Sequence, residues 1–215
     1  MKIGVLGTGM VGSAIASKLV SLGHEVKMGS REAGNEKGRH WATAAGAGAS
    51  AGTFAEAAKF GEIVFSATLG SAAIEALQAA GKENLRGKVL VDVSNPLDFS
   101  KGMPPTLLTA AAGDSLGERI QREFPDAKVV KALNTVNASV MADPARVRGE
   151  SDLFVCGNDP GAKEKVTTLL RNFGWKSILD LGDITGARGM EAYLLLWLRL
   201  YGLLKTADFN IRVVR

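Results

Sequence analysis

Residues 2–12 read KIGVLGTGMVG, a short apolar run that passes directly into a Gly-x-Gly-x-x-Gly turn. The continuous apolar run predicts a strand that is buried on both faces. After the turn, apolar residues recur at helical spacing as far as Gly23, which predicts a helix that ends there. A strand, a glycine-rich turn and a helix in this order are typical of a site that binds the pyrophosphate of a dinucleotide.

Each glycine of the turn has its own expected role. Gly7 permits the tight turn, Gly9 lets the backbone approach the pyrophosphate, and Gly12 lets the helix pack closely on the strand. The helix N-terminus would present unpaired N–H groups and a partial positive charge to the phosphates. The alternative is an ordinary glycine turn without a ligand, but the order of the three elements favours dinucleotide binding.

The second strand is expected within EVKMGSREAGNEKG, residues 25–38, and it lacks an acidic residue at its end. A site that prefers NAD usually has Asp or Glu there, bonded to the ribose hydroxyls. Ser30 and Arg31 stand there instead, and a hydroxyl with a guanidinium suits a 2′-phosphate. Glu32 follows at once, and we expect it to face solvent. Charge-assisted bonds of ~1.5–3 kcal/mol predict a roughly ten- to hundredfold preference for NADP(H) over NAD(H).

Two further cations in the same stretch, Lys37 and Arg39, could complete the 2′-phosphate site. The irregular sequence leaves the choice between them open. A solvated turn is the alternative interpretation of the whole stretch.

The remainder of the chain continues to alternate between strand and helix patterns. Short apolar runs predict further strands within residues 62–68, 87–94, 127–135, 151–158 and 175–182. Between the second strand and these runs, residues 34–61 are rich in Ala and Gly and predict a loop, a weak helix and a short third strand. Such alternation is typical of an α/β fold, here a Rossmann-type doubly wound parallel sheet.

The regular alternation predicts two parts. Residues 1–144 would form an NADP-binding Rossmann domain, and residues 145–215 a small C-terminal α/β extension packed on it. The extension would include a long helix at about 184–206. Within the first part, Ser115 and Glu118 have the spacing of a capping box, which predicts a helix start there.

Composition excludes several classes of function. Among the 215 residues, 46% are hydrophobic and 22% charged, which is typical of a soluble globular protein. The formal net charge is +4, but the basic residues are scattered, which argues against a nucleic-acid partner. The longest apolar run, residues 193–204, contains Arg199 and is too short to cross a bilayer. A strand beginning at Lys2 leaves no room for a signal peptide, so we expect a cytoplasmic protein.

Cysteine and histidine are scarce. The single cysteine, Cys156, lies in an apolar run and is expected to be a buried strand thiol in a reducing compartment. The two histidines, His24 and His40, lie far from it in the sequence and fit structural or solvated roles. We therefore predict no metal site.

Three segments together carry a family resemblance. Residues 2–31, 129–141 (VVKALNTVNASVM) and 153–182 resemble the NADP oxidoreductase, coenzyme F-420-dependent family over nearly the whole chain. The same segments resemble the NADPH-binding domain of the six-transmembrane epithelial antigen metalloreductases and, more distantly, pyrroline-5-carboxylate reductase. The resemblance implies hydride transfer between NADP(H) and a second ring cofactor, which is the deazaflavin F-420 or a flavin such as FMN or FAD. It also implies a homodimer.

The resemblance further implies a set of cofactor-binding residues, most of which follow the expected strands. They are Thr8, Met10 and Val11 at the pyrophosphate, Ser30 and Arg31 at the 2′-phosphate, Thr68, Leu69 and Gly70 at the ribose and nicotinamide, and Ser94, Asn95, Pro96, Ala132, Leu133 and Asn134 as the nicotinamide wall. These positions agree with the rule that doubly wound sheets bind ligands at the carboxyl ends of their strands.

The hydride-acceptor site is less well defined. Asn134 stands where the F-420-dependent enzymes commonly have His, which is closer to the metalloreductase pattern. Thr185 matches a Ser/Thr region that faces the second cofactor in the family. No side chain is identified as a certain catalytic group, because hydride transfer depends chiefly on positioning. Asp92 and Lys131 end two strands, and each could contact cofactor or form a salt bridge.

Two other functions remain open at this point. One is an NADP(H)-binding sensor or regulatory module without turnover. The other is a small imine or carbonyl reductase, although the extension is too short for the helical dimerisation domain of pyrroline-5-carboxylate reductase-like enzymes.

Overall fold

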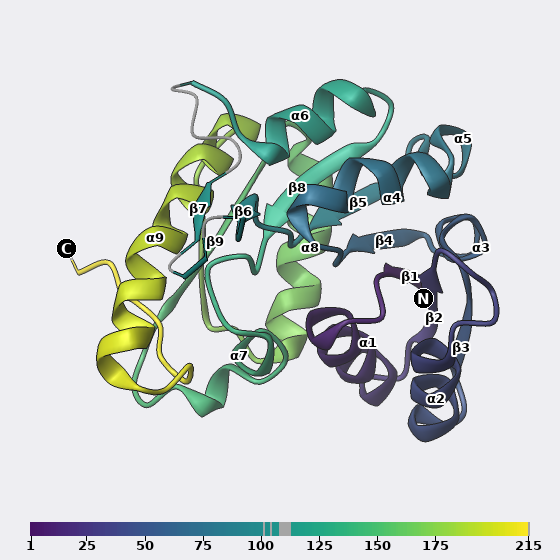
Figure 1. The fold of residues 1–215 in the computed structure, drawn as a ribbon, viewed down its shortest axis with the longest axis horizontal. Coiled ribbons are helices and arrows are strands. Elements are labelled where there is room, and N and C mark those ends of the chain that lie inside the picture. The colour runs from purple at the N-terminus through teal and green to yellow at the C-terminus, as the bar shows by residue number, and fades with distance from the viewer. Residues whose placement is uncertain (101, 104, 108–112, 215) are drawn as a thin grey trace.

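The computed structural model describes residues 1–214 except 101, 104 and 108–112. In this part of the chain, one eight-stranded sheet runs through the centre of the molecule in the order β10-β9-β8-β5-β4-β1-β2-β3 (Figure 1). Its strands are β1 (Lys2–Leu6), β2 (Glu25–Ser30), β3 (Ala49–Thr53), β4 (Ile63–Ser66), β5 (Val89–Asp92), β8 (Lys128–Ala132), β9 (Asp152–Gly157) and β10 (Ser177–Asp180). A separate hairpin pairs β6 (Leu97–Asp98) with β7 (Thr106–Leu107).

Six neighbouring strands have the order β8-β5-β4-β1-β2-β3, which confirms the predicted Rossmann-type doubly wound topology. They are parallel to one another, and the continuous apolar sequence of β1, β4 and β5 follows from burial on both faces of the sheet. The sheet then changes direction, because β9 pairs antiparallel with β8 while β10 runs parallel to β9. The sheet is thus continuous across residue 144, and the division of the chain there stays a prediction.

Helices cover both faces of the sheet. They are α1 (Met10–Ser21), α2 (Glu36–Ala45), α3 (Phe54–Phe60), α4 (Ala73–Ala80), α5 (Lys82–Leu85), α6 (Leu116–Glu123), α7 (Ala138–Ala142), α8 (Pro160–Phe173) and α9 (Ala187–Leu204), with 3-10 turns η1 (Gly70–Ala72), η2 (Pro144–Arg146) and η3 (Ile184–Gly186). Apolar side chains of α1, α2, α7 and α8 share one hydrophobic core with one face of the sheet. Those of α3 to α6 and the beginning of α9 share a second core on the other face.

Residues 34–61 contain the helix and the short third strand that the sequence predicted, α2 and β3, together with a second helix, α3, that it did not predict. Asn35 caps α2, accepting a hydrogen bond from the Gly38 amide at 3.0 Å. Thr53 and Glu56 form a capping box that starts α3 directly after β3. The Ala/Gly-rich stretch, residues 44–52, ends α2, turns at 46–48 and enters β3, which pairs with β2 at the edge of the sheet.

The capping box expected at α6 forms only in part. Ser115 accepts a hydrogen bond from the Glu118 amide at 3.1 Å, as predicted. The Glu118 carboxylate does not bond the Ser115 amide; it accepts from the Ser115 hydroxyl and from the Arg188 guanidinium of α9. A long-range ion pair that the local sequence could not indicate has taken the carboxylate.

The long helix α9 crosses one end of the sheet, and the chain turns back along it (Figure 1). The segment after α9 bonds to the start of β9, where the Asp152 amide donates to the Ile211 carbonyl at 2.9 Å. In the part of the chain that the structure describes, none of the helices combines the length and apolar character that a membrane crossing needs.

Candidate functional site

A cavity of ≈ 860 Å³ lies where β1, β2, β4, β5 and β8 end. This volume falls within the range of small-molecule sites, ~300–1,000 Å³. Its lining includes Gly7, Thr8, Gly9, Met10, Val11, Ser30, Arg31, Thr68, Leu69, Gly70, Ser94, Asn95 and Asn134. Residues far apart in the sequence thus meet at one edge of the sheet, where doubly wound folds bind their ligands.

The glycines of the turn after β1 have two roles. Gly12 allows close packing of the helix, and Gly9 leaves space for a ligand. Gly7 has φ +125°, and its amide donates to the Gly29 carbonyl at 2.9 Å. A Cβ on Gly12 would collide with the Gly7 carbonyl oxygen, so Gly12 is required for packing the helix on the turn. A Cβ on Gly9 would meet no protein atom within 4 Å. The space beside Gly9 is therefore open to a ligand.

The N-terminus of α1 is suited to an anion. Gly9 is its N-cap residue, no side chain caps the helix, and its first turn contains no acidic residue. The first N–H groups of a helix have no intrahelical partner, and the helix dipole makes this end electropositive. Met10, 76% exposed, and Leu69, 73% exposed, flank this part of the cavity with apolar side chains.

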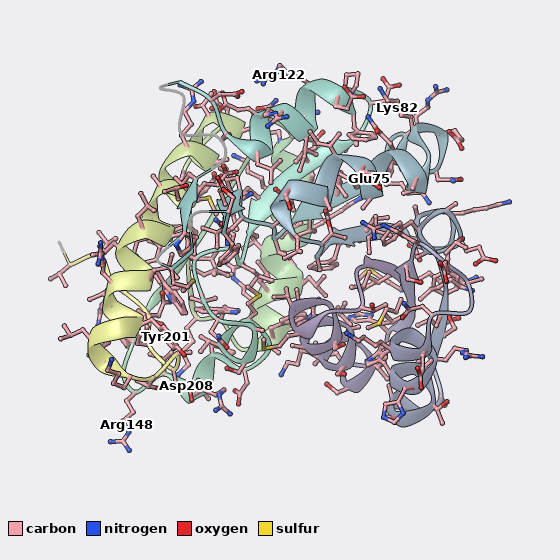
Figure 2. The ribbon with its side chains drawn as sticks, viewed as in Figure 1. Glu75, Lys82, Arg122, Arg148, Tyr201 and Asp208 are labelled. Carbon is pink, nitrogen blue, oxygen red and sulfur yellow. The ribbon has the colours of Figure 1, made fainter. Side chains whose placement is uncertain are left out.

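The end of β2 has one buried and one exposed polar residue. Ser30 is buried, and its hydroxyl donates to the Glu32 carbonyl at 2.5 Å. The Arg31 side chain is 72% exposed, and its Nε is 4.0 Å from Oε1 of Glu75. Glu75 lies on α4 (Figure 2). A long contact between two exposed side chains holds the guanidinium only weakly, so Arg31 can turn to another anion. Glu32 is exposed, as predicted, but it also lines the cavity.

The turn after β8 presents Asn134 to the cavity in a constrained geometry. Leu133 has φ +63°, an uncommon conformation for a residue with a side chain. Its fully buried side chain, packed in the core, holds the strained backbone in place. Asn134 Nδ2 donates to Asn95 Oδ1 at 2.9 Å and to the Met190 carbonyl at 3.1 Å, and Asn95 Nδ2 donates to the Asn134 carbonyl at 2.8 Å.

Three hydrogen-bonding atoms of this part of the cavity lack partners. Thr68 Oγ1, Thr135 Oγ1 and Asn134 Oδ1 are buried and have no hydrogen-bond partner among the described residues. All three belong to residues that line the cavity. A buried polar atom without a partner costs about 1–3 kcal/mol, so such a group fits a site that a polar ligand completes.

The far end of the cavity is apolar and is contributed by the C-terminal part of the chain. Leu194 and Trp197 of α9 line it, together with Met141 of α7. The Trp197 ring stacks with that of Tyr201, with centroids 5.5 Å apart, and with that of Phe209, with centroids 5.2 Å apart. Figure 2 shows Tyr201 at the same end of the molecule as Asp208, on the segment that returns from α9. Of the three rings Trp197 lines the cavity, and the stacking supports it there as an aromatic wall.

Charge is confined to the opposite end. The charged residues among the described lining are Arg31, Glu32 and Glu75. The first two follow β2, and Glu75 lies beside Arg31. The cavity therefore has a charged end at β2 and an uncharged, partly aromatic end at α9.

Several residues predicted for the site do not line the cavity. They are Gly12, Lys37, Pro96, Ala132, Leu133 and Thr185. Lys37 and Arg39 are exposed on α2, and Ala132 is fully buried in the core. The exposed Thr185 lies on η3, where its hydroxyl donates to Asp183 Oδ1 at 2.5 Å. No sequence pattern indicated that Leu194 or Trp197 lines the site, because their helix is apolar on most sides.

Other predicted residues have structural contacts. Lys131 and Asp92 form a fully buried salt bridge at 2.7 Å and do not line the cavity, so of the two alternatives the structure shows the salt bridge. Cys156 is fully buried, and burial raises the pKa of its thiol to about 12. Among the residues that the structure describes, no three His, Cys, Asp or Glu side chains are grouped as a metal site would need.

Comparison with known proteins identifies relatives of this chain. Residues 2–96 match the model of the family described as NADP oxidoreductase, coenzyme F420-dependent. The crystal structure of a candidate F420-dependent NADP reductase from Arthrobacter sp. FB24 is 51% identical, covers all of both chains, and superimposes with a TM-score of 0.94.

Two curated proteins are more distant relatives. The F420-dependent NADP reductase of Methanocaldococcus jannaschii is 32% identical over 132 residues, which are 61% of this chain and 59% of that protein. Metalloreductase STEAP3 of Rattus norvegicus is 31% identical over 193 residues, which are 89% of this chain but 36% of that protein. The alignments thus span less than two thirds of the length of each of these two relatives.

Proposed function

The chain belongs to the NADP oxidoreductase, coenzyme F420-dependent family, and we propose that it transfers hydride between NADP(H) and a second, planar ring cofactor. The acceptor would be the deazaflavin F-420 or a flavin, FMN or FAD. The observation that carries the proposal is that one cavity joins an anion-binding helix end to an uncharged, partly aromatic wall. When bound, NADP(H) supplies the hydride and its nicotinamide ring.

The phosphates would be held at the β1 and β2 ends of the cavity. The pyrophosphate would lie against Gly9 and the first N–H groups of α1, with Thr8, Met10 and Val11 beside it. The 2′-phosphate would pair with the Arg31 guanidinium, whose present contact with Glu75 is long and exposed. The Ser30 hydroxyl would have to leave the Glu32 carbonyl to donate to the same phosphate.

The nicotinamide would lie between the ends of β4, β5 and β8. Thr68, Leu69 and Gly70 would line one side, and Ser94, Asn95 and Asn134 the other, with Pro96 and Ala132 supporting them from behind. The amide nitrogen of Asn134 is already occupied by two protein acceptors, whereas its oxygen has no partner among the described residues. This oxygen would accept from the carboxamide of the nicotinamide.

The second ring would occupy the cavity end that Leu194, Trp197 and Met141 form. This wall excludes water and fixes the plane of an aromatic ring. Because hydride transfer needs close approach rather than an acid or base, these residues would act by positioning. The proposal gives no role to Thr185, which lies outside the cavity lining.

The proposal includes a cytoplasmic homodimer. Helix α9 exposes several large apolar side chains, Leu195, Leu196, Tyr201, Leu203 and Leu204. Exposed apolar side chains of this size on one helix are a feature of protein–protein interfaces. A second copy of the chain would cover it, and the single, buried thiol suits a reducing compartment. Sedimentation of the wild type and of Leu196→Glu would test the dimer, which we expect the substitution to weaken.

The 2′-phosphate assignment is tested with Arg31→Ala and calorimetric titration of NADPH and NADH. We expect the preference for NADPH to fall by roughly ten- to hundredfold, because a charge-assisted contact is lost. The control is Lys37→Ala, since Lys37 is exposed and does not line the cavity. An unchanged NADPH/NADH affinity ratio in Arg31→Ala would remove Arg31 from the site.

Hydride transfer is tested by following NADPH absorbance with F-420, FMN, FAD and ferric iron as separate acceptors. Oxidation that depends on one of the ring cofactors supports the proposal and identifies the acceptor. Tight NADPH binding without acceptor-dependent oxidation would instead identify a sensor module.

A further inference from the structure

A cluster of charged side chains is buried directly behind the proposed nicotinamide wall. Lys131 of β8 lies between Asp92, at the end of β5, and Glu191 of α9. Nζ is 2.7 Å from Asp92 Oδ2 and 2.9 Å from Glu191 Oε1. The side chains of Lys131 and Asp92 are 0% exposed and that of Glu191 is 2% exposed. We call these three residues the buried triad.

Every charged group of the buried triad is occupied by protein. Lys131 also donates to the Ser94 carbonyl at 2.7 Å, so its three N–H donors are all used. Asp92 Oδ1 accepts from the amide and hydroxyl of Ser94. The Glu191 oxygens accept from the amides of Leu116 and Gly117 at 2.9 and 3.0 Å, which are the first residues of α6.

The electrostatic arrangement keeps Lys131 charged. Burial alone lowers the pKa of Lys131, but the adjacent carboxylates of Asp92 and Glu191 more than offset this and raise it above its usual value. One ammonium faces two carboxylates, and the positive N-terminus of α6 partly compensates the second of them. The triad is therefore a closed unit, and none of its three residues lines the cavity.

The triad is linked to both loops of the proposed nicotinamide wall. It holds the carbonyl, amide and hydroxyl of Ser94, and Ser94 precedes Asn95 in the cavity lining. Asn134, on the other loop, donates to the carbonyl of Met190, which immediately precedes Glu191. Consecutive residues of α9 thus fix the two loops relative to each other.

Stability alone is a weak explanation for such a cluster. Replacing a buried ion pair by apolar residues of similar volume is often neutral or stabilising, because desolvation opposes the attraction. Hydrogen bonds to fixed oxygens, in contrast, set the direction of each backbone group they hold. Apolar packing around Ser94 would not fix its carbonyl in one orientation.

We propose that Lys131, Asp92 and Glu191 are positioning residues, which set the Ser94–Asn95 loop and Asn134 in the geometry that receives the nicotinamide. The inference rests on the proposed NADP(H) function. Helix α9 would then act at the nicotinamide ring through Glu191. The same helix would also form the wall for the second ring, through Leu194 and Trp197.

The test separates the nicotinamide from the rest of the cofactor. Dissociation constants for NADPH and for adenosine 2′,5′-bisphosphate, which lacks the nicotinamide, are measured by calorimetry. Emission of bound NADPH reports the surroundings of its ring. The variants are Glu191→Gln and the triple variant Lys131→Met, Asp92→Asn, Glu191→Gln, in which no ionised triad residue is left unpaired. Glu164→Gln, at an exposed position of α8, is the control.

We expect NADPH affinity to fall by about tenfold in both variants and its emission to shift toward that of free NADPH, while bisphosphate affinity stays within about twofold. A triple variant that melts near the wild-type temperature and still binds NADPH more weakly would support a positioning role for the triad rather than a purely stabilising one. Wild-type NADPH affinity and emission in the folded triple variant would overturn the inference. Should the triple variant not fold, Glu191→Gln decides by the same readouts. A wild-type protein that binds neither ligand would overturn the proposed function itself, and this inference with it.

Discussion

The β2 end of the cavity and the protein interior behind the proposed nicotinamide wall use their cations in opposite ways. At the β2 end, the Arg31 side chain is 72% exposed and its partner Glu75 is 4.0 Å away. Behind the proposed nicotinamide wall, Lys131 is fully buried and its three donors are used by protein acceptors. An exposed cation remains available for a ligand, whereas a buried cation shapes the protein around the ligand. In the proposed function, the same kind of charge therefore binds the ligand in one region and positions the protein in the other.

The largest expected effect comes from removing Lys131, the buried cation. Lys131→Met leaves the Asp92 and Glu191 carboxylates buried without their shared partner, and we expect a loss of about 3–5 kcal/mol in the free energy of unfolding. Urea denaturation measures it. The matched control is Lys128→Met on the same strand, where an exposed pair with Asp159 contributes about 0–1 kcal/mol. Equal stability of the two variants would contradict the assigned role of burial.

The glycine turn has an open space for a ligand beside Gly9 and a close packing contact at Gly12, three residues later. Gly9→Ala adds a methyl group that meets no protein atom within 4 Å, so we expect an unchanged melting temperature. The methyl group would occupy the space for the pyrophosphate, and losing charge-assisted bonds there lowers NADPH affinity by roughly ten- to hundredfold. Gly12→Ala should lower both quantities, because its methyl group collides with the Gly7 carbonyl. Thermal melting and calorimetry distinguish the two, and a destabilised Gly9→Ala would show that the space is not open.

The difference between the surroundings of Arg31 and those of Lys131 also explains which parts of the site the sequence could predict. The glycine turn and Arg31 follow strands directly, so short-range patterns located both beside the cavity. The topology was predictable because each buried parallel strand reads as an apolar run. The partners of Lys131 lie 39 and 60 residues away in the chain, and no local pattern indicates them. The sequence left Lys131 with two alternatives, and only the fold decided between them.

The aromatic wall was missed for a related reason. Trp197 and Leu194 lie on a helix that is apolar on most sides, and such a pattern predicts burial without saying against what. Trp197 is held by Phe209, which comes after the helix. Which side of α9 meets the cavity is therefore set by tertiary packing and by the segment that returns along the helix.

A third, smaller prediction concerns the ion pair that anchors α9 to α6. Hydrogen bonds from Arg188, at 2.6 and 2.9 Å, hold the pKa of Glu118 below its usual value. Because the folded-state pKa is the lower one, ionised Glu118 stabilises the fold at any pH above its unfolded-state pKa, near 4.5. This stabilisation is lost as the pH falls through the folded-state pKa. Glu118→Gln should thus be less stable by about 1 kcal/mol at neutral pH, and its stability curve should meet that of the wild type in acid.

Chemical denaturation at a series of pH values measures this convergence. Glu164→Gln serves as the control, because Glu164 is an exposed residue of α8 and its removal should leave the acid limb unchanged. Parallel curves for Glu118→Gln and the wild type down to low pH would show that the ion pair contributes nothing to acid sensitivity.

The smallest expected effect is at Cys156, which lies opposite Lys131 across the β8–β9 pair. Burial raises the pKa of this thiol to about 12, so the reactive thiolate is scarce at neutral pH. We expect no reaction of the native protein with a disulfide reagent over the time in which the urea-unfolded protein reacts fully. Rapid modification of the native protein at neutral pH would show that the interior around Lys131 opens readily.

The position of Glu191 so late in the chain has a consequence for how the molecule is made. A ribosome releases the strands of the β2 end of the cavity first, and these can pair as they emerge. Lys131 and Asp92 are also synthesised early, but the second carboxylate of their cluster arrives only with α9. We therefore expect a nascent chain to form the proposed phosphate end of the cavity first, and the proposed nicotinamide wall only after α9 has left the exit tunnel.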